Sequence, residues 1–161
     1  MIWARRFFLQ ILLWFLGGAH RSLWGQPLAP RCKIFTVDEA RTVEAICEQI
    51  VPADEFPGAI AAGVLYYIDG SLAGELRRFR KDYRDGLLLV DDMSRARHGK
   101  RFGEIGWEQQ FALLQQLETA PGKGGEFFGL VRQHTMEGYY GDPKYGGNRN
   151  AASWKMIGFQ G

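Results

Sequence analysis

Apolar residues return every three or four positions along most of the chain, which is the spacing of one face of a helix. No stretch alternates apolar and polar residues in the way that a half-buried strand does. The pattern therefore predicts an all-α fold, a bundle of about five helices. The expected helices cover residues 37–50, 59–72, 75–97, 107–118 and 126–139.

Local signals set the ends of these helices. Thr36 and Glu39 have the spacing of a capping box, which is expected to start the first helix. Residues 120–125, APGKGG, look like a phosphate-binding loop, but a glycine follows the lysine where such a loop needs Ser or Thr. We interpret this segment as a flexible turn. From Tyr140 onward the glycine, proline and aromatic residues have no helical period, which predicts an irregular tail.

Residues 1–19 are typical of an export signal. Arg5 and Arg6 precede an apolar run at residues 7–16, and small residues follow the run. A helix that spans hydrocarbon needs roughly 20 apolar residues, so a run of this length does not predict a membrane anchor. Residues 20–35 contain two prolines and no period, and they are expected to be an extended lead-in to the helical domain at 36–161.

The paired arginines, followed by Phe8 and Leu9, indicate a signal of the twin-arginine type. A general secretory signal with two chance arginines is the alternative. The twin-arginine route carries chains that are already folded, which suits a protein that travels with a cofactor-bearing partner. We expect the chain to use the twin-arginine export machinery and to reside in the periplasm.

Charge and cysteine content narrow the possible partners further. The formal net charge is +2, and a chain trimmed after Ala19 would carry equal numbers of basic and acidic residues. A neutral body argues against a nucleic-acid partner, because clustered Lys and Arg drive phosphate binding.

Cys32 and Cys47 could close a disulfide in an oxidising compartment, or they could be two separate buried thiols.

The sequence contains no motif that would identify an enzyme. The nucleotide-binding, nucleophile-elbow, Walker and zinc-protease patterns are all missing. His134 and Glu137 are one helical turn apart, but a single HxxE is not a di-iron motif, and a structural histidine is the favoured interpretation. Asp91 and Asp92 are adjacent and so point to different sides of a helix. We expect no catalytic, metal or cofactor-binding residues in this chain.

Residues 138–148, GYYGDPKYGGN, could form a pocket, a stacking platform or a surface that fits another protein. Together with Trp154-Lys155-Met156-Ile157-Gly158-Phe159, this stretch resembles the small-subunit family of gluconate 2-dehydrogenase. Residues 50–54, 57–59 and 62–64 share the resemblance, which covers roughly residues 35–161. Gln160 departs from it, since a proline is expected there.

The resemblance implies a gamma subunit of a membrane-associated dehydrogenase for a sugar or sugar acid. In such complexes a large flavoprotein with FAD oxidises the substrate, and a multihaem cytochrome c with haem c accepts the electrons. The small subunit carries neither cofactor. It is expected to accompany the flavoprotein, which has no signal of its own, through export and to support its maturation.

The tail is then expected to hold the partner interface. Tyr140 and Tyr145 are the strongest candidates, because tyrosine is favoured at interface centres, whereas Trp154 and Phe159 are expected to fold inward. The full set of expected interface residues is Tyr139, Tyr140, Asp142, Pro143, Tyr145, Asn148 and Trp154.

Two other functions remain open from the sequence. A carbohydrate-binding module would stack sugar rings on Tyr139, Tyr140, Tyr145 and Trp154. A stand-alone hydrolase would use His134, Glu137 and Asp142.

Overall fold

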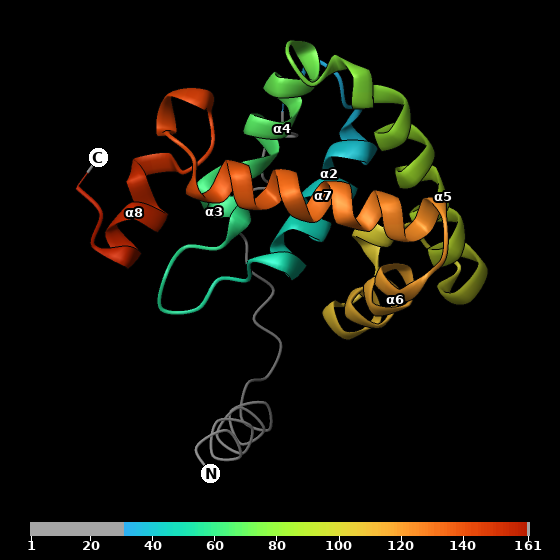
Figure 1. Cartoon of the computed structure of the whole chain (residues 1–161). Coiled ribbons are helices and arrows are strands. Elements are labelled where there is room, and N and C mark those ends of the chain that lie inside the picture. The colour runs from blue at the N-terminus through green and yellow to red at the C-terminus, as the bar shows by residue number, and fades with distance from the viewer. Residues whose placement is uncertain (1–30, 161) are drawn as a thin grey trace, which may run out of the picture.

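A computed structural model describes residues 31–160, and within this range the chain forms helices and no strands (Figure 1). The predicted all-α fold is confirmed. The export signal and most of the lead-in lie outside the described residues. The α-helices are α2 (Val37–Ile50), α3 (Ala59–Ala62), α4 (Val64–Ala73), α5 (Arg80–His98), α6 (Trp107–Thr119), α7 (Lys123–Tyr140) and α8 (Ala152–Ile157).

Helix α7 crosses the middle of the molecule and contacts α2, α4, α5 and α6 (Figure 1). The apolar faces of these helices meet in one core, in which Val43, Ile68 and Val131 are fully buried. Helices α5 and α8 lie at opposite ends of α7. Of the helices that the structure describes, none has the length and apolar character needed to cross a bilayer.

The start of α2 is fixed in the way the sequence predicts. The backbone N–H of Glu39 donates to Thr36 Oγ1 at 3.3 Å, and the backbone N–H of Thr36 donates to the Glu39 carboxylate at 2.8 Å. The lead-in just before it is held by Asp69 of α4. This buried carboxylate accepts hydrogen bonds from the backbone N–H groups of residues 33–35. The carboxylate of Asp69 therefore helps to fix the N-terminal connection to the body.

Two of the expected helix boundaries are wrong. The predicted helix 59–72 is split at Gly63, which has a φ of 74° and ends α3. Helix α5 begins at Arg80 rather than near residue 75, because a short 3₁₀ helix, Arg77–Phe79, precedes it.

The expected turn at 120–125 is also shorter than predicted. Helix α7 already begins at Lys123, after Gly122 with a φ of 68°. Gly124 lies against Leu117 and Ala120, so the absence of a side chain lets α7 start close to the end of α6. Gly122 thus supplies the positive φ before the helix, and Gly124 allows close helix packing.

The tail after Tyr140 is not irregular. It contains two 3₁₀ helices, Pro143–Tyr145 and Arg149–Ala151, and then α8. Asn148, Asn150 and Ala151 all have positive φ, which is uncommon for residues with a side chain. The tail is a specific folded unit that packs on the end of α7.

Candidate interaction surface at the C-terminal end

The histidine and the glutamate singled out in the sequence make separate structural contacts. His134 is buried, and its Nδ1 lies 3.0 Å from the hydroxyl of Tyr83, whose ring is stacked on the imidazole. Burial lowers the pKa of His134, so the ring is neutral at physiological pH. Glu137 is exposed and accepts a hydrogen bond from the Tyr67 hydroxyl at 3.0 Å. The pair is not arranged as an acid and a base that share one substrate.

The aspartate pair also divides between two environments. Asp91 is buried and accepts a hydrogen bond from the backbone N–H of Phe102 at 3.1 Å. Asp92 is exposed, as its adjacent position on the helix predicts. Among the described residues, no group of three or more His, Cys, Asp or Glu side chains is placed to hold a metal ion. Asp91 therefore has its partners inside the fold, whereas Asp92 lies at the surface and pairs with Arg95.

Both cysteines are free thiols in the structure, so the possible disulfide between Cys32 and Cys47 is not formed there. Cys47 is buried in α2 and contacts the hydroxyl of Thr135 at 3.2 Å. Burial raises the pKa of Cys47 to about 12 and that of Cys32 to about 11. A thiol that is buried and protonated is a poor nucleophile.

Asn148 is the central hydrogen-bonding residue of the tail. It is fully buried, its Nδ2 donates to the carbonyl of Gly141 at 2.9 Å, and its Oδ1 accepts from the backbone N–H of Ser153 at 3.0 Å. These bonds join the end of α7 to the start of α8. Its φ of 44° lies in the left-handed region that asparagine tolerates better than most residues.

Close backbone packing holds the tail against α7 and α4. Gly147 lies against the backbone of Gly138, where a side chain would clash. Arg149 extends across Gly63 and places its guanidinium 4.2 Å from the centre of the Tyr66 ring. The left-handed break between α3 and α4 thus makes room for a side chain from the tail.

Tyr139 and Asn148 were expected at a partner interface, and the structure buries both of them within the chain. Only 2% of Tyr139 is exposed, and its hydroxyl donates to the carbonyl of Pro57 at 2.7 Å. Asp142 caps the 3₁₀ helix that begins at Pro143, and Lys144 lowers the pKa of its carboxyl through a hydrogen bond. Tyr139 and Asn148 therefore fix the tail, and Asp142 and Pro143 shape its turn.

The remaining tail residues divide between partial burial and exposure. Trp154 is half-buried, as expected of an inward-facing ring, whereas Phe159 was expected inside and is 55% exposed. The two rings pack edge to face, 4.9 Å between their centres. Tyr140 and Tyr145 are 39% and 58% exposed, which leaves both free to meet a partner.

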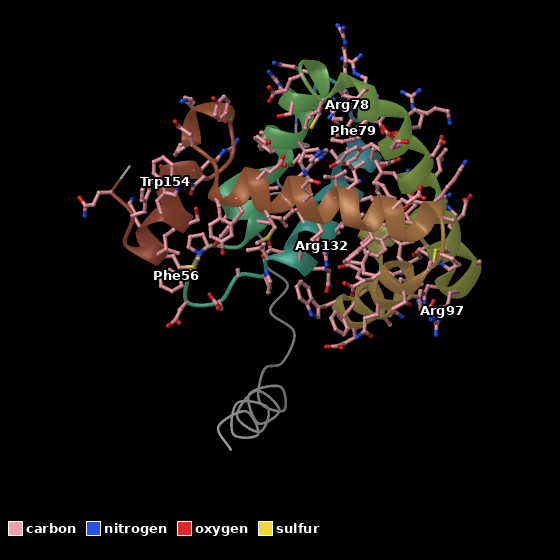
Figure 2. All side chains as sticks on the ribbon, in the orientation of Figure 1. Phe56, Arg78, Phe79, Arg97, Arg132 and Trp154 are labelled. Carbon is pink, nitrogen blue, oxygen red and sulfur yellow. The ribbon has the colours of Figure 1, made fainter. Side chains whose placement is uncertain are left out.

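Apolar side chains outside the tail extend this exposed set. Phe56, from the loop after α2, lies at the same end of the molecule as Trp154 (Figure 2). Ile60 of α3 and Ile157 of α8 are also about half exposed. Sequence reasoning missed Phe56 because it lies in a loop, and Ile60 because an apolar residue within an expected helix is normally taken to face the core. We call the exposed apolar residues at this end the tail surface: Phe56, Ile60, Tyr140, Tyr145, Ile157 and Phe159.

The family model for gluconate 2-dehydrogenase subunit 3 matches residues 37–161. The chain belongs to this family. The match begins at the first residue of α2 and runs through the whole tail, so it includes both the bundle and the tail surface. A search of curated proteins and a search of solved structures each found no match. As its name states, the gluconate 2-dehydrogenase subunit 3 family consists of subunits of a dehydrogenase complex.

Proposed function

We propose that this chain is a non-catalytic accessory subunit of a periplasmic, membrane-associated dehydrogenase that oxidises gluconate or a sugar. The catalytic partner is a large flavoprotein with FAD, and a multihaem cytochrome c accepts the electrons. The accessory subunit escorts the flavoprotein through the twin-arginine export machinery and supports its maturation.

The tail surface is the observation that supports this function best. Six large apolar side chains are exposed on segments that lie together at one end of the chain, and exposed apolar residues gathered in this way favour a protein-binding surface. The backbone beneath them is held by the buried hydrogen bonds of Asn148. A surface that is already rigid loses little conformational entropy on binding, which favours tight attachment.

The use of the polar residues in the bundle favours a non-catalytic role. Each of the three candidate residues has a different structural partner. His134 contacts Tyr83, Glu137 accepts from Tyr67, and Asp142 accepts from the backbone N–H of Lys144. A hydrolase would need such groups to converge on one point within hydrogen-bond reach of a substrate. The three side chains instead stabilise the helix packing and the turn of the tail.

A carbohydrate-binding function is less well supported by the same geometry. Stacking on a sugar needs ring faces that are open to solvent, but Tyr139 is buried and Trp154 is half-buried beneath Phe159. Calorimetry of the purified chain with gluconate, glucose, fructose and sorbitol separates the two functions. An accessory subunit gives no heat of binding with any of them.

The escort function is tested by co-expressing the chain with a large flavoprotein dehydrogenase from its native host and then separating periplasm from cytoplasm. Both proteins are expected in the periplasm with the natural sequence, and both are expected in the cytoplasm with Arg5→Lys and Arg6→Lys together. The control is the flavoprotein expressed alone, which is expected to stay in the cytoplasm. Export of the flavoprotein without this chain would contradict the proposal.

A further inference from the structure

Helix α5 and the first half of α7 enclose a groove of about 700 Å³. Its floor is apolar and is made by Phe79, Leu88, Leu89, Phe127 and Leu130. Leu88 is 56% exposed and Leu89 36%, although both belong to a helix that packs on the core. We call this feature the α5–α7 groove. It lies toward the opposite end of α7 from the tail surface, so the two are separate sites (Figure 1).

The rim of the α5–α7 groove carries more acid than base. Asp82, Asp85, Asp92 and Glu126 line it, together with Lys81 and Lys123. Lys81 pairs with Asp85, and Arg95 pairs with Asp92. Among residues 31–160, neither Asp82 nor Glu126 takes part in an ion pair. An apolar segment that also carries basic residues matches this groove.

We propose that the α5–α7 groove binds the export signal of the same chain, residues 5–16, before export. This segment has the required chemistry, because Arg5 and Arg6 stand directly before the apolar run. Within it Phe8, Ile11, Leu12 and Phe15 follow the spacing of a single helical face, and Arg5 precedes Phe8 by three positions on that spacing.

The connection between the signal and the body is long enough and begins close to the groove. The backbone of residues 33–35 is fixed by Asp69, and the ring of Phe35 lies 5.7 Å from that of Tyr83. Tyr83 in turn packs on Phe127 in the floor of the groove, 5.9 Å between ring centres. Residues 17–32 can span up to about 55 Å when extended. A folded unit of this size has a radius of gyration of about 14 Å, so the signal can reach the groove.

Binding within the chain would keep the apolar run of the signal out of water while the chain waits for export. The signal becomes available when the export machinery binds it more strongly than the groove does. The charge match contributes little by itself, because exposed ion pairs are weak, and the apolar floor supplies most of the attraction. This inference depends on the export signal and not on the identity of the dehydrogenase partner.

Photo-crosslinking of the whole chain tests the proposal. Benzoylphenylalanine replaces Leu88 in the groove, and in a matched control it replaces Trp107, which is 45% exposed outside the groove. The chain is produced in cells that lack the twin-arginine translocase and is irradiated there. Only full-length chain, identified by its mass, is analysed, and the crosslinked peptides are mapped by mass spectrometry.

The expected result is an adduct within one chain between position 88 and a peptide from residues 5–16, absent from the position 107 control. With Asp82→Asn and Glu126→Gln together, the yield falls roughly threefold, because exposed ion pairs are individually weak. Circular dichroism of the same variant checks that the helices are intact. An adduct at twice the chain mass, an adduct with another protein, or no adduct with residues 5–16 overturns the proposal.

Discussion

The indole nitrogen of Trp154 donates a hydrogen bond to the backbone carbonyl of Tyr140 at 2.9 Å. This bond joins α8 to the last residue of α7, which has no intrahelical partner for its carbonyl. The ring of Tyr140 packs edge to face on buried Tyr139, 5.0 Å between their centres, and remains 39% exposed. The fold therefore holds an exposed aromatic ring in a fixed position at the C-terminal end.

Replacing both Tyr140 and Tyr145 by alanine is expected to weaken attachment to the flavoprotein at least tenfold while the helices stay folded. Exposed tyrosines at the centre of an interface each contribute about 1–2 kcal/mol or more to binding. Both rings are exposed, so their removal leaves the core of the chain unchanged. The measurement is the dissociation constant for the flavoprotein, together with the melting temperature of the variant.

The matched control for the tyrosine variant removes two exposed aromatic rings from a different part of the surface. Trp107 and Phe111 of α6 are 45% and 46% exposed, and replacing both by alanine is expected to leave binding unchanged. An intact complex from the tyrosine variant would mean that the tail surface is not the interface. A fall in melting temperature by several degrees would assign the two rings to the fold instead.

The helices that could be predicted from the sequence are those whose signals are local. The first helix was predicted with both ends correct, because the capping box of Thr36 and Glu39 and the apolar stripe lie within the segment itself. The break at Gly63 could not be predicted, since it accommodates Arg149, which is distant in the sequence. The early start of α7 depends likewise on Gly124 packing against α6.

The exposure of two tail tyrosines was predictable from the sequence, but the roles of several other tail residues were not. Composition drew attention to the tail, and the family resemblance then favoured Tyr140 and Tyr145 as interface residues; both are exposed. Asn148 was expected at the surface, but it is buried because Gly141 and Ser153 supply its partners only in the folded tail. Phe56 joins the tail surface through tertiary packing, which leaves no periodic signal in the sequence.

Asn148→Gly is expected to lower the free energy of unfolding by about 2–3 kcal/mol, because two buried hydrogen bonds are lost and their partners remain buried. Glycine accepts the positive φ at this position, so the variant removes the amide without adding backbone strain. Asn150→Gly is the control, since Asn150 also has a positive φ but is exposed. The free energies of unfolding of the two variants, measured in urea, should differ by this amount. Equal urea midpoints would show that the Asn148 bonds do not stabilise the tail.

Both cysteines are expected to react as free thiols when the chain is unfolded without reductant. In the native chain Cys47 should resist alkylation, because a pKa of about 12 leaves roughly a thousandfold less thiolate at pH 8 than an ordinary thiol has. Mass spectrometry after iodoacetamide treatment counts the modified residues in the native and the unfolded chain. A mass two hydrogens lower, with no modification in denaturant, would instead demonstrate the disulfide.

The pH dependence of stability is expected to include a contribution from His134. Burial lowers its pKa in the native chain below the value of about 6.5 in the unfolded chain, despite the opposing charge of Glu137. As the pH falls below about 6.5, the unfolded chain therefore binds a proton that the native chain does not. The stability that is present above that pH is lost progressively toward the lowered native pKa, by at most about 1.4 kcal/mol at pH 5.5.

Urea unfolding at pH 7.5 and pH 5.5 measures this contribution of His134 when the natural chain is compared with His134→Asn. Asparagine keeps a hydrogen-bonding group for the Tyr83 hydroxyl near the place of Nδ1 but does not titrate, so the variant should lose less stability between the two pH values. Tyr83→Phe is the control, because it removes the hydrogen-bond partner and leaves the buried imidazole in place. It should be less stable at both pH values and still lose stability on acidification, because burial is the main cause of the lowered pKa of His134. If His134→Asn loses as much stability on acidification as the natural chain does, other groups cause the pH dependence.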